Sequence, residues 1–208
     1  MRALIAAIAI LFASVSAANA QSSGNVRVID PADAAAFIES IGAQAVQILR
    51  NQDITLEDRE AQLRDIVEDS FNFRAIGRFA LGSDTWDAAS DAERTEYLYL
   101  FSTFLLQSYT RRFGGYSGQT LLINEARQHR DRDALVITTI ETEGADSTDV
   151  TWLVRESEDG PRILDVIIDG TSMALTQKRE FEAILAREQL TGLLELLRLR
   201  ITRFSAES

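Results

Sequence analysis

Apolar residues recur at helical spacing through the first part of the chain, after a start signal at Asp30 and Pro31. Asp30 is a typical N-cap residue and Pro31 suits the first helical position, so a helix is predicted to about Arg50. Thr55, followed by acidic residues, predicts the start of a second helix that carries Leu56, Leu63, Ile66 and Val67.

Two further helix starts follow in the next stretch. Asn72 predicts a short helix that ends where Gly82 can adopt a positive φ. Ser90 and Glu93 form an S-x-x-E capping box, which predicts a longer helix with an apolar stripe that Gly114 and Gly115 end. The N-terminal part of the chain is therefore expected to be helical.

From Gln119 the apolar period changes to two, which is typical of strands. The alternating positions are Leu121 and Ile123; Leu135, Ile137 and Thr139; Val150, Trp152 and Val154; and Leu164, Val166 and Ile168. Short polar turns between these runs favour an antiparallel meander of four strands. Two C-terminal helices are predicted, one from about Gln177 to Arg187 and one from about Thr191.

Residues 1–20 have the pattern of a secretory signal peptide. Arg2 precedes an apolar run from Ala3 to Phe12, and Ala18-Asn19-Ala20 offers a small-x-small cleavage site. The apolar run is shorter than the roughly 20 residues of a membrane span. Cleavage after Ala20 is expected, and Gln21 at the new terminus, in place of Cys, argues against a lipid anchor.

Composition removes several function classes. The chain of 208 residues has no Cys and one His, and its net charge is -11. No cysteine or multi-histidine metal site is possible, so we expect no metal. The negative charge argues against nucleic acid as a partner and against prolonged residence on an anionic membrane.

The sequence offers little for catalysis, and we expect a protein that is not an enzyme. His129 lies at the end of a predicted strand, where an exposed turn is the simpler interpretation. Asp165 and Asp169 stand four apart on a predicted strand and would share a face, which could serve acid/base chemistry. Solvent-facing acids are common on strands, so we predict no catalytic residues.

A set of apolar and aromatic residues suits either a packed core or the wall of a cavity. Its members are Phe79, Trp86, Phe101, Phe104, Leu105, Tyr109, Val150, Trp152, Val154, Val166, Ile168, Met173 and Phe181. Their apolar pattern by itself favours plain packing, because core and dry cavity use the same side chains.

An ordered set of motifs, from about residue 31 to residue 201, resembles the MlaC family of periplasmic phospholipid-binding proteins, also called the toluene-tolerance family. The matching stretches are Phe71-Asn72-Phe73, Ile76 to Phe79, Leu81-Gly82, Trp86, Ser90 to Arg94, Phe104, Tyr109, Asp165 to Met173, Arg179, Phe181, Ile184 and Leu193 to Leu197. The most specific is Asp165 to Met173, which resembles the family's D-V-x-I-E-G-V-S strand end.

The resemblance implies an α+β fold: N-terminal helices, a four-stranded antiparallel sheet and C-terminal helices packed around an apolar cavity. Residues 21–208 would form one lipid-binding domain, and the set of apolar and aromatic residues given above, Phe79 to Phe181, would line its cavity. The implied function is a monomeric periplasmic carrier that has phospholipid as cargo and no cofactor.

The resemblance also implies partners. The carrier would shuttle phospholipid between an outer-membrane lipoprotein-porin complex and an inner-membrane MCE-domain ABC transporter, of which it is an auxiliary component, and so maintain outer-membrane lipid asymmetry. Two alternatives remain open: a carrier of hopanoid or another polycyclic lipid, and an exported cone-fold enzyme that uses Asp165 or Asp169.

Overall fold

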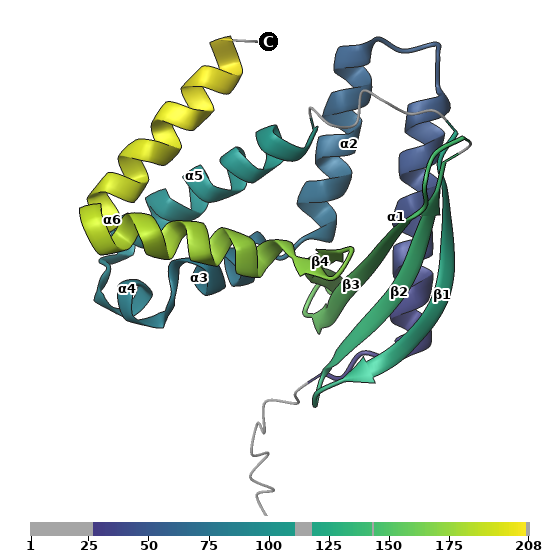
Figure 1. Cartoon of the computed structure of the whole chain (residues 1–208), viewed down its shortest axis with the longest axis horizontal. Coiled ribbons are helices and arrows are strands. Elements are labelled where there is room, and N and C mark those ends of the chain that lie inside the picture. Colours follow the sequence, from purple (N-terminus) through teal and green to yellow (C-terminus); the bar gives the residue numbers. More distant parts are fainter. Residues whose placement is uncertain (1–26, 111–117, 143, 207–208) are drawn as a thin grey trace, which may run out of the picture.

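The computed structural model describes residues 27–110, 118–142 and 144–206 and shows a sheet with helices beside it (Figure 1). The first two helices, α1 (Pro31–Arg50) and α2 (Leu56–Ser70), begin at the expected caps. The Asp30 side chain accepts a hydrogen bond from the Ala32 amide, and the Thr55 hydroxyl accepts one from the Asp58 amide. Each cap satisfies an amide that the helix itself leaves unpaired.

The next three helices are α3 (Phe73–Leu81), α4 (Ser83–Ala88) and α5 (Asp91–Thr110). Asn72 caps α3 as expected, and Gly82 has a φ of 84° where α3 ends. The six-residue helix α4 was not predicted, because it is too short to show a helical period. The glycine pair expected to end α5, Gly114 and Gly115, lies outside the described residues.

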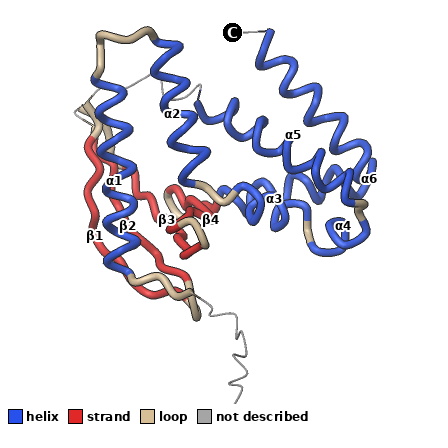
Figure 2. The backbone as a smooth tube through the Cα atoms, turned by 180° about the vertical axis from the view of Figure 1, so that it is seen from behind, coloured by secondary structure: helices blue, strands red, loops and turns tan. Residues whose placement is uncertain are grey.

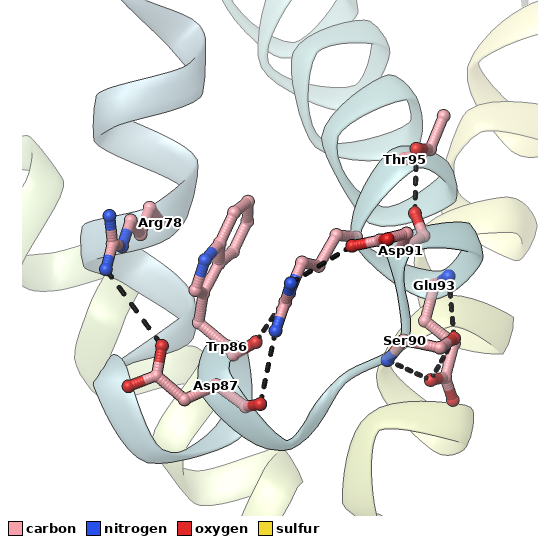
Figure 3. Close-up of polar contacts among 8 residues, drawn as sticks. Arg78, Trp86, Asp87, Ser90, Asp91, Glu93 and Thr95 are labelled. Carbon is pink, nitrogen blue, oxygen red and sulfur yellow. Dashed lines mark hydrogen bonds and ion pairs between the residues drawn. The ribbon is translucent and has the colours of Figure 1, made fainter.

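The junction between α4 and α5 is held by side-chain contacts (Figure 3). Ser90 and Glu93 form the predicted capping box, with the Ser90 amide 2.8 Å from the Glu93 carboxylate. The Ser90 hydroxyl also donates to this carboxylate, at 2.7 Å, and the hydrogen bonds from the hydroxyl and from the amide lower the pKa of Glu93. Trp86 is buried, and its ring lies 5.7 Å from the guanidinium carbon of Arg78 and 5.6 Å from that of Arg94.

The sheet contains the four predicted strands and a fifth, very short one. The strands are β1 (Thr120–His129), β2 (Asp133–Glu141), β3 (Thr148–Ser157), β4 (Gly160–Ile168) and β5 (Thr171–Ser172). They lie in sequence order, and every neighbouring pair is antiparallel. This is the predicted meander, with β5 added at its edge.

A β-bulge in β4 interrupts the alternation that the sequence showed there. Leu153 pairs with Asp165, but the next residue, Val154, pairs with Ile163, so the register shifts across Leu164. A bulge places two residues opposite one and moves the following side chains to the other face. Ile163 is consequently fully buried in the same cluster as Val154, a position that strict alternation did not assign to it.

Helix α6 (Met173–Ala206) closes the chain and is broken at Gln189, whose φ of 56° and ψ of -167° are not helical. The break confirms the prediction of two C-terminal helical segments. The first segment begins earlier than expected, because the Ser172 hydroxyl accepts a hydrogen bond from the Leu175 amide and caps it. Across the three described ranges, no helix has the length and hydropathy of a membrane span.

Two hydrophobic clusters form the interior. One joins α3, α4, α5 and α6 and includes Phe101 and Phe181, while the other joins α1 to the sheet and includes Ile38 and Ile163. Phe71 packs against both clusters. Figure 2 shows α1 lying along the sheet and α3, α5 and α6 grouped beyond it. The two clusters therefore face each other across the middle of the molecule.

Candidate functional site

An apolar cavity of about 340 Å³ lies between the two clusters, within the range of ligand pockets, about 300–1,000 Å³. Its walls come from α1, α2, α3, α5, α6 and from the first four strands. The helical walls are Ile38, Ile41, Gly42, Ala45, Val46, Leu63, Ile66, Val67, Ser70, Phe73, Ile76, Phe101, Leu105, Met173, Ala174 and Gln177. The remaining walls are Phe71, Gln119, Thr120, Leu121, Ile140, Trp152, Ile163, Leu164, Asp165, Val166 and Ile168.

The walls from α1 and α2 follow from helical geometry. On α1 the lining positions Ile38, Ile41 and Ala45 follow one another at intervals of three and four residues, and on α2 Ile66 and Val67 lie three and four residues after Leu63. Such residues share one face of a helix. The sequence showed both stripes, but it did not show that they border a cavity, so these residues were missed as lining residues.

A buried hydroxyl fixes the aromatic side chain of the sheet wall. The indole nitrogen of Trp152 donates a hydrogen bond to the Thr138 hydroxyl at 3.0 Å, and this hydroxyl donates to the Val150 carbonyl oxygen at 2.9 Å. Thr138 is fully buried. The indole therefore has one defined position beside the cavity, with its polar atom satisfied.

The acidic side chain in the wall is used as a structural acceptor. The Asp165 carboxylate accepts hydrogen bonds from the Ser172 hydroxyl at 2.5 Å and from the Ala174 amide at 2.9 Å, which attaches the start of α6 to β4. Each carboxylate oxygen thus has a donor within the fold. The amide at the start of a helix is a donor that would otherwise lack a partner.

The expectation that Asp165 and Asp169 share a strand face is wrong. Strand β4 ends at Ile168, and Asp169 lies in the following turn with a φ of 47°. Its carboxylate accepts a hydrogen bond from the Asp149 amide at 3.2 Å. The two acids therefore do not share a strand face, so paired acid/base chemistry of the kind that their spacing allowed has no geometric support.

Six of the residues expected to line a cavity do so: Phe101, Leu105, Trp152, Val166, Ile168 and Met173. The other members lie elsewhere. Trp86, Phe104 and Phe181 belong to the cluster among the helices, Val150 and Val154 are buried on β3, and Phe79 is 47% exposed. The side chain of Tyr109 lies outside the described part of the chain. Lipid binding by these residues stays a prediction.

The remaining chemistry at the site is sparse. Within residues 27–110, 118–142 and 144–206 no group of three or more His, Asp or Glu side chains is placed to hold a metal ion. His129 is the last residue of β1, as the sequence indicated, but it is paired within the sheet and partly buried, so the exposed turn expected for it is wrong. The arrangement can therefore enclose an apolar ligand, and the described side chains around it do not form a nucleophile-base set.

Comparison with known proteins agrees with this geometry. A solved structure of a phospholipid-binding protein from Ralstonia solanacearum, in complex with a phospholipid, superposes with a TM-score of 0.73. The match covers 83% of this chain and 99% of that chain at 22% sequence identity, which shows a common fold. The family described as MlaC protein matches residues 39–199, which is most of the chain. The chain therefore belongs to the MlaC family, and its α+β fold is the fold of that family.

Proposed function

We propose that this protein is a phospholipid carrier that shelters acyl tails in the cavity between its two hydrophobic clusters. The observation that carries the proposal is the hollow itself, since its walls are branched and aromatic side chains that fill it only in part. Membership of the MlaC family and the phospholipid bound to the Ralstonia solanacearum protein support the same cargo.

The energetics of such a carrier require an enclosed apolar site. A diacyl lipid with about 30 methylenes gains on the order of 24 kcal/mol when its tails leave water, at about 0.8 kcal/mol per methylene. A carrier must offset most of this to remove the lipid from a membrane. A cavity walled on one side by α1 and α2 and on the other by α3, α5 and α6 meets this requirement better than an open groove.

The headgroup is proposed to remain outside. Among the described residues that line the cavity there is no Arg or Lys, and the polar side chains include Gln119, Thr120 and Gln177. Burying a phosphate without a cation would cost far more than leaving it in water. The tails therefore enter and the phosphate stays at the mouth.

The route of the carrier follows from the family. We propose export with cleavage after Ala20, a single domain over residues 21–208, and action as a periplasmic monomer. The exchange partners are the inner-membrane MCE-domain ABC transporter and the outer-membrane lipoprotein-porin complex, which gives a role in outer-membrane lipid asymmetry. No catalytic step and no cofactor is needed, since the carrier only transfers a non-covalent cargo.

A matched pair of substitutions on α1 tests the proposal. Ala45 lines the cavity, whereas Ala43, two residues away on the same helix, is exposed. Ala45→Trp adds an indole to the cavity and is expected to reduce the lipid that co-purifies or exchanges with the protein, measured by extraction and mass spectrometry. Ala43→Trp adds the same side chain to solvent and should leave lipid content unchanged.

The outcomes separate the alternatives. Absence of any co-purifying or exchangeable lipid in the unsubstituted protein would exclude the carrier function. Equal lipid content in the two variants would place the lipid outside the cavity. A polycyclic lipid in the extract would keep the carrier function and replace the phospholipid as its cargo.

A further inference from the structure

A second concave surface lies across α3 from the cavity and carries a different chemistry. This basic groove is lined by Arg74, Arg78, Phe79, Arg155 and Lys178, together with small and polar residues, and encloses about 630 Å³. Among the described residues that line it there is no Asp or Glu. Four cationic side chains thus converge on one open surface.

Two of these cations pair with acids that do not themselves line the groove. Arg155 forms a two-pronged contact with the buried Asp133, from Nε to Oδ1 at 2.5 Å and from Nη2 to Oδ2 at 2.8 Å. Lys178 Nζ lies 2.5 Å from a Glu182 carboxylate oxygen and 6.0 Å from the centre of the Phe79 ring. Because the two-pronged contact fixes Arg155, little conformational entropy is lost when a ligand binds that side chain.

The other two cations are more open to solvent. Arg78 extends toward Asp87 at the edge of the groove, with a nitrogen-to-oxygen distance of 4.0 Å (Figure 3). Arg74 is exposed and makes no hydrogen bond or ion pair with the described residues. Exposed ion pairs contribute little to stability, so Arg78 can exchange its partner at low cost. Both arginines are therefore available to an incoming anion.

The sign of this surface is opposite to that of the whole chain. The net charge is -11, and Lys178 is the only lysine in the sequence. An acidic partner would be repelled by most of the molecule and attracted at the basic groove, which fixes the orientation of an encounter. A uniformly acidic carrier would lack such orientation.

The exposed aromatic ring identifies the class of partner. Phe79 is 47% exposed within the basic groove, and arginine and aromatic side chains are the residues that dominate protein interfaces. A bilayer surface is broad and cannot enter a concave site, and an anionic bilayer is repelled by the rest of the chain. We infer that the basic groove docks an acidic segment of a partner protein, one that places an apolar side chain against Phe79.

Helix α3 and the start of α6 each contribute residues to both the groove and the cavity. On α3, Phe73 and Ile76 line the cavity while Arg74 and Phe79 line the groove. Near the start of α6, Gln177 lines the cavity and Lys178 lines the groove. A docked segment would therefore contact the helices that close the cavity. The inference does not depend on what the cavity holds.

The test uses the purified full protein and a synthetic glutamate-rich peptide with one central phenylalanine. Binding measured by nuclear magnetic resonance is expected to shift amide signals around α3 and Lys178. Arg74→Glu should weaken the affinity by at least about fivefold, as expected for reversal of a contacting charge. Phe79→Ser should also weaken it, and the same peptide with glutamine in place of glutamate should not bind.

The control is Arg64→Glu, which makes the same charge change at an exposed arginine on α2. Thermal unfolding of each variant verifies that the fold is retained. Absence of peptide binding, or equal weakening by Arg64→Glu and Arg74→Glu, would overturn the inference. Binding of phosphatidylglycerol vesicles that Arg74→Glu abolishes, without peptide binding, would overturn it in favour of a membrane surface.

Discussion

At the scale of single residues, Thr138 determines the position of the largest side chain in the sheet wall. Its hydroxyl accepts from Trp152 and donates to the Val150 carbonyl, and no water can replace it in a fully buried position. Thr138→Val keeps the shape of the side chain and removes the acceptor. We expect a loss of about 1–3 kcal/mol, the cost of a buried polar group without a partner.

Urea denaturation checks this expectation against the neighbouring position. Thr139→Val makes the same change where the hydroxyl contacts Asn124 and Asp149 at an exposed site, so solvent can replace the lost partner. Its effect on the free energy of unfolding should be smaller than that of Thr138→Val. Equal effects would show that the Trp152 contact does not contribute as described.

Because of Tyr97, the free energy of unfolding is expected to fall as the pH rises in the alkaline range. It is fully buried, donates a hydrogen bond to the Gly77 carbonyl at 2.9 Å and stacks on Phe101. Burial raises the pKa of Tyr97 above its ordinary value. A tyrosine in the unfolded chain ionises near its ordinary pKa of about 10, while the folded chain keeps the proton. Above about pH 10 the free energy of unfolding should therefore fall, by up to about 1.4 kcal/mol per pH unit.

Two tyrosine substitutions isolate this contribution. Tyr97→Phe removes the ionisable group and should flatten the decline in stability between about pH 9 and about pH 11, at a cost near neutral pH of about 1 kcal/mol for the hydrogen bond. Tyr99→Phe, at a residue that is 68% exposed, should leave the decline unchanged. The check is the denaturant midpoint of the unsubstituted protein and of both variants, measured across this pH range. Parallel curves for all three proteins would show that Tyr97 does not cause the decline.

At the scale of secondary structure elements, the break in α6 is the clearest point of backbone strain. Gln189 has a φ of 56° and a ψ of -167°, a region that is essentially restricted to glycine. Strain of this kind costs on the order of 1–3 kcal/mol. Gln189→Gly is therefore expected to stabilise the protein by about 1 kcal/mol, since glycine adopts this conformation freely.

Gln189→Ala is the control for loss of the side chain. Alanine has the same Cβ constraint as glutamine, so it should give no comparable gain in thermal midpoint. A gain for alanine equal to that for glycine would mean that the glutamine side chain, and not the backbone, carries the strain.

Most elements follow from local sequence signals, and those that do not have identifiable causes. The caps at Asp30, Thr55 and Asn72 and the box at Ser90 act within three residues, so the sequence located the starts of α1, α2, α3 and α5. Helix α4 is too short to have a period. The bulge at Leu164 depends on the pairing partner in β3, which a single strand's pattern does not contain.

At the scale of the whole molecule, the cavity lies between the two hydrophobic clusters. Residues of both clusters line the cavity and Phe71 packs against both, so a lipid held there would contact both clusters. Ligand that binds only the folded chain stabilises it, by about 2.7 kcal/mol when its concentration is one hundred times the dissociation constant. Protein stripped of lipid by solvent extraction is therefore expected to melt at a lower temperature.

Reloading with phosphatidylglycerol should restore the midpoint, as measured by calorimetry. In the Ala45→Trp variant the difference between stripped and reloaded protein should be smaller, because the added indole occupies the site of the tails. Identical midpoints for stripped and reloaded unsubstituted protein would show that the lipid does not bind the folded chain.

The sequence by itself determined the starts of α1, α2, α3 and α5, the meander, the family resemblance and the absence of cysteine chemistry, because each depends on residue identity or on neighbours a few positions away. It could not separate Trp152, which borders the cavity, from Trp86, which packs between two arginines. Both are aromatic residues in apolar patterns. Which of them faces a hollow depends on the spacing between two clusters built from distant segments, and only the tertiary structure decided that spacing.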